Sequence, residues 1–284
     1  MISDLFDLKG KTAIITGGGG VLCRSMAQEL ASRGANVAIL DMREEAAKQA
    51  ADEITLAGGL AIGIGCNALD KTSLEEARCL VLAEYGGIDI LINGVGGNNP
   101  RATTSCERCQ ISDLKEAPEG LKTFFDLDAD SVAFVFNLNF IGTLLPSQVF
   151  GRVMAEQGNG VILNVSSMNA LRPLTKIPAY SAAKAAISNF TQWLATHFAP
   201  VNVRVNAIAP GFFLTDQNRF LLTDEKTGEL SPRGNTIIAH TPMARFGTPE
   251  DLSGALVWLV SDASRFVTGV VVPIDGGFSA FSGV

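Results

Sequence analysis

Short apolar runs alternate with longer amphipathic stretches along nearly the whole chain. The runs are almost continuously apolar and rich in β-branched residues, which is typical of strands buried on both faces of a parallel sheet. The stretches between them repeat apolar residues at helical spacing. The pattern predicts strands at 12–16, 36–41, 60–66, 88–93, 160–166, 202–208 and 269–274, and helices at about 20–33, 43–57, 72–85, 130–156, 179–198 and 249–261.

This alternation of strands and helices predicts an α/β fold. We expect a Rossmann-like, doubly wound parallel sheet of seven strands with helices on both faces. The length of 284 residues fits one large domain better than two, so residues 1–284 are expected to form a single domain.

Two stretches, at about 97–128 and 212–248, break the regular pattern. Both are polar and longer than an ordinary connection, and loops of this length in a compact domain are usually functional or disordered. Both follow the carboxyl ends of predicted strands, where open α/β sheets bind ligands. We therefore predict that these two loops contact the substrate.

Charge narrows the range of partners. The net charge of −7 repels nucleic acid and anionic membranes, so neither is an expected partner. The first residues are acidic rather than basic, and no apolar run approaches the ~18 residues that span a bilayer. We expect a cytoplasmic protein.

Metal chemistry is also disfavoured, because the chain has two His and five Cys. The pair Cys106 and Cys109 lacks a second ligand pair, and we interpret it as two loop cysteines rather than a metal or redox site. We predict no bound metal.

A glycine run, Gly17 to Gly20, joins the first predicted strand to the first helix. Such a run lets the backbone approach a pyrophosphate, whose charge is met by free amides at the helix start. Asp41 ends the second strand about 20 residues on, where a carboxylate binds ribose hydroxyls and repels a 2′-phosphate. This favours NAD over NADP, although Arg43 argues for caution. The alternative is a tight structural turn without ligand.

With this glycine run and Asp41, the sequence resembles the short-chain dehydrogenases/reductases, and the resemblance covers nearly its whole length. The family motif Thr-Gly-x-x-x-Gly-x-Gly reads Thr16-Gly-Gly-Gly-Gly-Val-Leu-Cys23, so Val21 and Cys23 replace the last two glycines. Asn67 stands where the family usually has Asp. The resemblance implies NAD binding by Gly17, Gly19, Gly20, Val21, Leu22, Asp41, Asn67, Ala68, Asn93, Gly94, Gly96, Tyr180, Lys184, Pro210, Gly211, Phe213 and Thr215.

Tyr180 and Lys184 lie four apart in a predicted helix and so share one face. A cation near a phenol lowers its pKa, which makes Tyr180 a plausible acid and base. The resemblance implies that Ser167 hydrogen-bonds the reacting oxygen and that Asn139 holds a water of a proton relay. Each feature also has a purely structural interpretation. Tyr180 and Lys184 could be an exposed pair on a helix, Ser167 could cap the end of a strand, and Asn139 could satisfy the backbone of a kinked helix. Their joint order and spacing favour catalysis.

The implied reaction is reversible hydride transfer between NAD and an alcohol. Polar residues beside the predicted site, with Lys176, Arg219, Arg245 and His240, suit a hydroxylated carboxylate. The chain looks like the branch of the family that interconverts D-fructuronate and D-mannonate, and the alternative is a gluconate 5-dehydrogenase or another polyol or sugar dehydrogenase. The expected substrate contacts are Asn98, Asn99, Ser167, Met168 and Asn169.

A function of another class is a catalytically inactive protein that senses NAD. The intact Ser167, Tyr180 and Lys184 argue against it, because a sensor does not need them. The apolar, uncharged terminal stretch 278–284 suggests burial at a subunit contact, in line with the homotetramers usual for the family.

Overall fold

Seven parallel strands form one sheet in the order β3-β2-β1-β4-β5-β6-β7. The computed structural model describes residues 5–115, 118–215, 219–224 and 227–283. The strands are β1 (Thr12–Thr16), β2 (Asn36–Asp41), β3 (Leu60–Gly65), β4 (Ile90–Asn93), β5 (Gly160–Val165), β6 (Val203–Pro210) and β7 (Val271–Ile274). The strand order reverses between β1 and β4, and open α/β sheets bind ligands at such a switch point.

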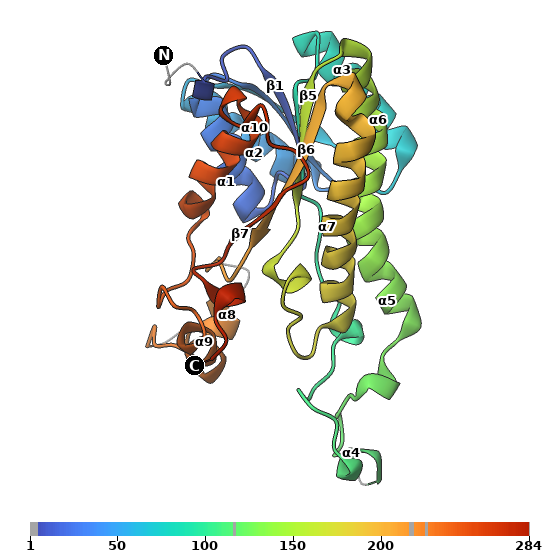
Figure 1. Ribbon diagram of the computed structural model, residues 1–284, viewed down its shortest axis with the longest axis vertical. Coiled ribbons are helices and arrows are strands. Elements are labelled where there is room, and N and C mark those ends of the chain that lie inside the picture. Colours follow the sequence, from blue (N-terminus) through green and yellow to red (C-terminus); the bar gives the residue numbers. More distant parts are fainter. Residues whose placement is uncertain (1–4, 116–117, 216–218, 225–226, 284) are drawn as a thin grey trace.

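Helices cover both faces of this sheet (Figure 1). One face carries α1 (Val21–Ser32), α2 (Glu44–Leu56) and α10 (Ser253–Val260), and the other carries α3 (Lys71–Tyr85), α6 (Gly142–Gln157) and α7 (Pro178–Phe198). Successive β1 residues serve opposite cores, because strand side chains alternate. Ile15 packs into the α1 side and Ile14 into the α6 side. The predicted fold class is confirmed.

The predicted helix at 130–156 is interrupted. It comprises α5 (Ala129–Phe136), a π-helical turn (Asn137–Ile141) and α6. The side-chain amide of Asn139 donates to the carbonyl of Val135 at 2.8 Å and to that of Gly97 at 2.7 Å. π-helical turns often occur at functional sites, and this one aims a buried amide at the loop after β4.

The expectation that no apolar run approaches membrane-spanning length was wrong. Within the described residues, Ala129–Gln157 is long and apolar enough, with a mean hydropathy of 1.4 over its best window. Length and composition are the only criteria it meets, and core helices meet them too. Thr143 and Ser147 face the core and donate to helix carbonyls, and α6 packs beside α3 and β5. We interpret the segment as a core helix.

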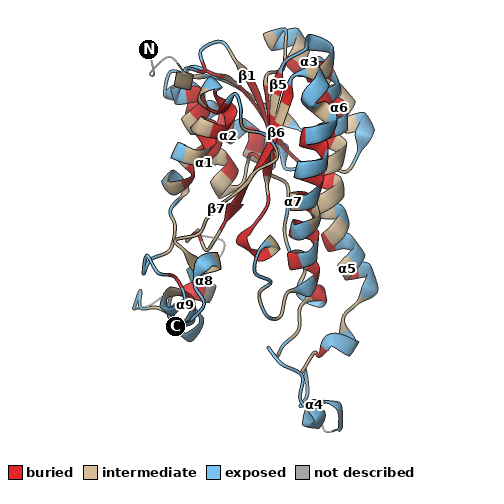
Figure 2. Ribbon diagram, viewed as in Figure 1, coloured by how far each residue is buried: buried red, intermediate tan, exposed pale blue. Residues whose placement is uncertain are grey.

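Both irregular stretches extend beyond the carboxyl end of the sheet (Figure 1). The first holds the short α4 (Ile111–Lys115), and the second holds α8 (Arg219–Leu222) and α9 (Pro232–Ala239). The first is closed at its base, where the Ser105 amide donates to the Lys122 carbonyl at 2.8 Å. Figure 2 shows that its tip is mostly exposed. Parts of the two predicted loops, 116–117, 216–218 and 225–226, lie outside the described residues.

Candidate active site

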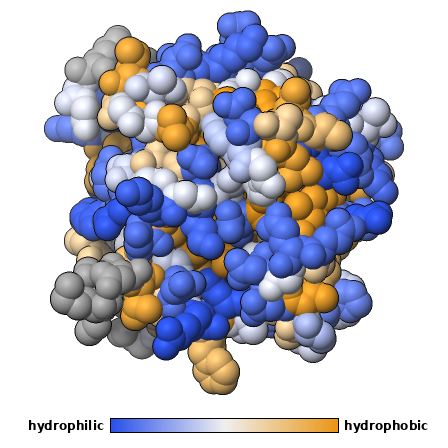
Figure 3. All heavy atoms as spheres, turned by 90° about the horizontal axis from the view of Figure 1, so that it is seen from above, coloured by the Kyte–Doolittle hydropathy of each residue, from blue (hydrophilic) through white to orange (hydrophobic). Residues whose placement is uncertain are grey.

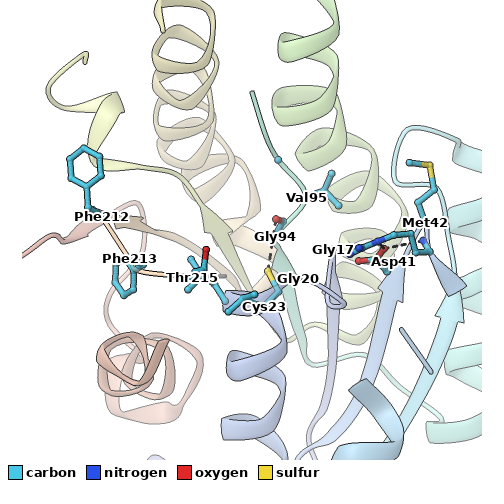
Figure 4. Close-up of a pocket in the computed structure, with 15 residues that line it drawn as sticks. Gly17, Gly20, Cys23, Asp41, Met42, Gly94, Val95, Phe212, Phe213 and Thr215 are labelled. Atoms are coloured by element: carbon cyan, nitrogen blue, oxygen red, sulfur yellow. Dashed lines mark hydrogen bonds and ion pairs between the residues drawn. The ribbon is translucent and has the colours of Figure 1, made fainter. Parts of the chain in front are cut away.

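A cavity of about 470 Å³ opens at the carboxyl ends of the central strands (Figure 4). Its walls come from the glycine turn and α1, the end of β2, the segment after β4 and the segment after β6. The lining residues are Gly17, Gly20, Val21, Leu22, Cys23, Asp41, Met42, Arg43, Gly94, Val95, Gly96, Gly211, Phe212, Phe213 and Thr215.

The glycine turn is built as its sequence predicts. Gly17 has a φ of 66°, in the left-handed region where glycine is favoured, and the Gly20 amide donates to the Gly17 carbonyl at 3.1 Å. Gly20 is the N-cap of α1 and has no side chain to cap it. The amides of the first turn of α1 therefore face the cavity mouth without a side-chain acceptor, which suits an anion.

Asp41 lies at the end of β2 and is nearly buried. Its carboxylate accepts from the Gly19 amide at 3.1 Å and from the Arg43 amide at 2.9 Å. The Arg43 side chain also reaches it, with Nε 3.4 Å from Oδ1. Asp41 thus fixes the glycine turn and still presents carboxylate lone pairs to the cavity.

Cys23, one of the two departures from the glycine motif, is accommodated by a glycine opposite it. Its Sγ lies 3.9 Å from the Gly94 carbonyl oxygen, and a Cβ on Gly94 would overlap that sulfur. Burial is the main cause that raises the pKa of Cys23 to about 12, so the thiol stays protonated. Gly94 is also held by Thr16, whose hydroxyl accepts from the Gly94 amide at 3.1 Å.

The four predicted catalytic residues converge beside this cavity. Tyr180 and Lys184 share a face of α7, with Nζ 5.6 Å from the phenol ring centre. Ser167 follows β5 and is hydrogen-bonded to Tyr180. A Cβ on Gly96 would lie 2.6 Å from Asn139 Oδ1 and 2.9 Å from Lys184 Nζ, so both polar groups meet at Gly96. Only a glycine leaves room for them.

The electrostatics of this group differ from the expectation that Lys184 lowers the pKa of Tyr180. Burial raises the pKa of Tyr180, and the hydrogen bond with Ser167 lowers it by less. Burial also lowers the pKa of Lys184 to about 8, and Nζ donates to the Val165 carbonyl at 2.8 Å. The phenol is therefore the resting form, because removal from water disfavours the phenolate more than its neighbours stabilise it.

Several residues predicted to bind the cofactor do not line the cavity. Asn93 lies behind it, where its amide donates to Ser147 Oγ at 2.9 Å and to Asn164 Oδ1 at 2.8 Å. Asn67 is exposed, and its side-chain oxygen accepts from the Leu69 amide at 3.0 Å. The others outside the lining are Gly19, Ala68, Pro210, Tyr180 and Lys184.

The segment after β6 forms the far wall. Gly211, Phe213 and Thr215 line the cavity as predicted, and Phe213 is buried beside Gly247. Gly211 lies against the turn after β7, because a Cβ there would come within 2.6 Å of the Asp275 Cβ. The sequence reasoning did not identify Phe212, Met42 or Val95, whose apolar side chains carry no chemical signal.

A second cavity, of about 610 Å³, adjoins the first through Phe212, which lines both. Lys176 and His240, expected near the substrate, line it. Arg245 does not, because its guanidinium is bound to Asp251 at 2.6 and 2.8 Å. Arg219 lies at the start of α8, also outside this lining.

None of the predicted substrate contacts, which all lie in the described part of the chain, is in the lining of the second cavity. Asn98 donates to Thr103 Oγ1 at 3.1 Å, and the Asn99 side chain accepts from the Arg101 amide at 2.8 Å. Met168 and Asn169 are buried in the turn after Ser167, whose hydroxyl accepts from the Asn169 amide at 3.3 Å. The lining residues Arg172 and Arg233 were not predicted.

Known proteins share this architecture. A family model described as enoyl-(acyl carrier protein) reductase matches residues 21–279. The uncharacterized oxidoreductase UxuB of Bacillus subtilis is 52% identical over 279 residues, covering 98% of each chain. An NAD-bound structure of a candidate D-mannonate oxidoreductase from Haemophilus influenza has a TM-score of 0.92 and 53% identity, with 98% of each chain covered.

More distant relatives act on different substrates. The 2-dehydro-3-deoxy-D-gluconate 5-dehydrogenase of Formosa agariphila is 32% identical, over 100% of this chain and 98% of its own. The 7alpha-hydroxysteroid dehydrogenase of Escherichia coli is 30% identical, over 97% of this chain and 96% of its own. Identity at this level therefore accompanies both sugar acids and steroids.

Proposed function

The chain belongs to the short-chain dehydrogenase/reductase family of oxidoreductases, and on that premise we propose that it transfers hydride between NAD and a sugar acid, D-mannonate or D-fructuronate. The observation that carries the proposal is the convergence of Ser167, Tyr180, Lys184 and Asn139 beside a cavity suited to a dinucleotide.

The residues present fit NAD. The open glycine turn and the uncapped start of α1 suit a pyrophosphate, and Asp41 at the end of β2 suits the adenosine ribose. Gly94 and Gly96 keep the wall after β4 free of side chains. Asp41 would repel a 2′-phosphate, although Arg43 beside it partly offsets that charge. When bound, NAD accepts a hydride from the alcohol or returns one to the ketone.

The protein residues handle the proton. In reduction, the Tyr180 phenol donates its proton to the oxygen of the substrate, and Ser167 holds that oxygen by a hydrogen bond. In oxidation, Tyr180 must first lose its proton and then takes one from the hydroxyl. Lys184 supplies positive charge beside the phenol, and Asn139, next to Nζ, extends the polar path towards Gly97. Because burial raises the pKa of Tyr180, the phenol at neutral pH is in the protonated form that reduction needs.

The substrate is proposed from two supports. The NAD-bound relative from Haemophilus influenza is a candidate D-mannonate oxidoreductase. The cavity that shares Phe212 with the cofactor cavity carries cationic side chains, which suit a carboxylate better than a steroid. A 2-dehydro-3-deoxy-gluconate or gluconate 5-dehydrogenase is the second candidate, since a relative with that activity is 32% identical. A homotetramer and a cytoplasmic location stay predictions.

A substrate panel tests the proposal. NADH oxidation is measured with D-fructuronate, 5-ketogluconate and a neutral cyclic ketone, together with NAD reduction by D-mannonate. We expect D-fructuronate and D-mannonate to be the best substrates. Faster turnover of 5-ketogluconate would favour the second candidate, and faster turnover of the neutral ketone would contradict the sugar-acid assignment.

The proton donor is tested with Tyr180→Phe, which keeps the ring and removes the hydroxyl. Turnover should fall by about 10³-fold or more, because positioned proton transfer contributes roughly 10²–10⁴-fold. NADH binding, followed by fluorescence, should be unchanged. Tyr85→Phe, on α3, is the matched control and should keep full activity. Substantial turnover by Tyr180→Phe would rule out the assigned role.

A further inference from the structure

The second cavity lies between segments that are distant in sequence. One wall is the loop 171–177, and another is α9. The loop connects the turn that follows Ser167 to the start of α7, where Tyr180 lies. It is thus tied at both ends to the proposed catalytic residues. A substrate held against it would remain next to the reacting group.

The charge of this cavity contrasts with that of the chain. Arg172, Lys176 and Arg233 line it together with one acid, Glu107, whereas the chain as a whole carries −7. None of these three cations is ion-paired with an acid among the described residues. Elsewhere at this end of the molecule, Arg101 pairs with Asp128 at 3.0 Å and Arg245 with Asp251 at 2.6 Å.

Hydrogen bonds hold two of these cations, Arg172 and Lys176, in place. Arg172 Nε donates to the Ser279 carbonyl at 3.1 Å, which ties the loop to the C-terminal segment and leaves its terminal nitrogens available. Lys176 has a φ of 71°, a strained conformation for a residue with a side chain. Its backbone carbonyl accepts from the Thr104 amide at 2.8 Å, which holds it there.

His240 adds a further polar contact. Its Nδ1 lies 2.7 Å from the Thr236 carbonyl oxygen and donates to it, because a carbonyl oxygen only accepts, so Nε2 is the ring nitrogen left to contact a ligand. The apolar parts of the lining, among them Phe212 and Ile237, limit the space left to water. The site therefore combines cations, a histidine and apolar walls.

We propose that this cavity binds the carboxylate end of the substrate, between Lys176 on the loop and Arg233 on α9, while the reacting carbon lies at Tyr180. The inference rests on the proposed function and adds to it the residues that select an acid over a neutral sugar. Lys176 and Arg233 lie on two different walls of the cavity, so each can bind one oxygen of a carboxylate.

The experiment compares D-mannonate with D-mannonamide, which has the same carbon skeleton without the charge. kcat/KM is measured for both, at saturating NAD, in Lys176→Gln, Arg233→Gln and the double variant. Each single variant should lower kcat/KM for the acid roughly 10- to 100-fold, because hydrogen bonds to charged groups contribute that much. The value for the amide should stay unchanged.

Arg265→Gln is the matched control. Arg265 is exposed and lies near Asp89 and Asn202, at the opposite end of the sheet. This variant should retain full activity on both compounds. Thermal unfolding verifies that all variants remain folded, which their surface positions favour.

The outcomes separate the two proposals. Equal losses for acid and amide, or no loss for the acid, would overturn the carboxylate site while the function stands. If the native protein turns over no sugar acid, the proposed function fails. Calorimetric titration of the NADH complex with D-mannonate then tests whether the cavity binds the carboxylate. Binding by the native protein that is lost in the double variant supports the carboxylate site, and no binding by the native protein overturns it.

Discussion

Lys184 is a buried cation whose protonation is linked to folding. Burial lowers its pKa from 10.5 to about 8, so between these values the unfolded chain holds a proton that the folded chain has released. Stability rises with pH wherever the unfolded state binds more protons. The buried charge is therefore costliest below pH 8, and this cost disappears as the pH rises to 10.5.

Lys184→Met removes this titration. The difference between the free energies of unfolding, native minus variant, should rise by about 1.4 kcal/mol per pH unit between pH 8 and 10.5. Urea unfolding of both proteins at pH 7, 8, 9 and 10 measures the difference. Parallel curves would show that Lys184 does not lose its proton in the folded state.

Cys23 and Gly94 are expected to depend on each other. A Cβ on Gly94 would overlap Cys23 Sγ and lie 2.7 Å from the Thr16 carbonyl oxygen. Gly94→Ala should destabilise the protein by about 1–3 kcal/mol, the usual cost of overpacking. Cys23→Gly in the same chain should recover part of that loss, because only the contact with Thr16 remains.

A double-mutant cycle by urea unfolding measures this coupling. It compares the native protein with Gly94→Ala, Cys23→Gly and the double variant. Additive effects would mean that the two residues do not share space. NADH titration of the four proteins shows whether the same pair shapes the cofactor cavity.

At the scale of elements, the stretch after β4 is a separable addition. The start and the end of this loop are joined by hydrogen bonds between Ser105 and Lys122. The Ser105 amide donates to the Lys122 carbonyl, and the Lys122 amide donates to Ser105 Oγ at 3.0 Å. Replacing 106–121 with a two-residue Asn-Gly turn should therefore leave the fold and NADH binding intact, since the described residues of this range, 106–115 and 118–121, are mostly exposed. The variant loses Glu107 from the second cavity, so KM for D-mannonate should change.

Circular dichroism with thermal melting tests the first part, and steady-state kinetics tests the second. Loss of cooperative unfolding would show that the stretch supports the core. An unchanged KM would show that it takes no part in substrate binding.

Most of the elements could be predicted from the sequence, because each carries its own local pattern. β1 and β2 have the predicted limits, since their apolar runs end at the glycine turn and at Asp41. The π-helical turn at Asn139 was not predictable, because it depends on contacts with Gly97 across the site. α9 was not predicted either, since it lies within a polar stretch that carries no strong periodicity.

The residues of the candidate site likewise fall into those that a local motif identifies and those that only the folded structure brings together. Gly17, Asp41 and Tyr180 lie in short local motifs and could be identified. Arg172 and Arg233 meet only in the folded chain, where the loop before α7 and α9 form two walls of one cavity. The pKa of Tyr180 was likewise not accessible, because the sequence shows the cation four residues away but not the burial.

At the scale of the whole molecule, apolar side chains remain exposed on the layer of α5, α6 and α7. Trp193 on α7 is 57% exposed and Phe134 on α5 is 46% exposed. The end of the molecule viewed in Figure 3 is mostly hydrophilic, with separate apolar patches among the hydrophilic side chains. A subunit contact would cover such side chains, and the homotetramer stays a prediction.

Trp193→Glu should therefore lower the mass in solution. We expect a tetramer for the native protein and a smaller species for the variant, as measured by light scattering across a range of concentrations. Phe266→Glu, which replaces a more exposed apolar residue after α10, is the control. A native monomer would contradict the expectation.

The position of β1 inside the sheet has a consequence for how the chain folds. β1 pairs with β2 on one side and with β4 on the other, in the register Thr16 to Asn93. During synthesis its second edge has no partner until residue 93 has left the ribosome, and an unpaired apolar edge attracts other chains. Pairing across such sequence separations is also slow. Nascent chains halted before β4 should therefore aggregate, and refolding from urea should be slow and most efficient at low protein concentration.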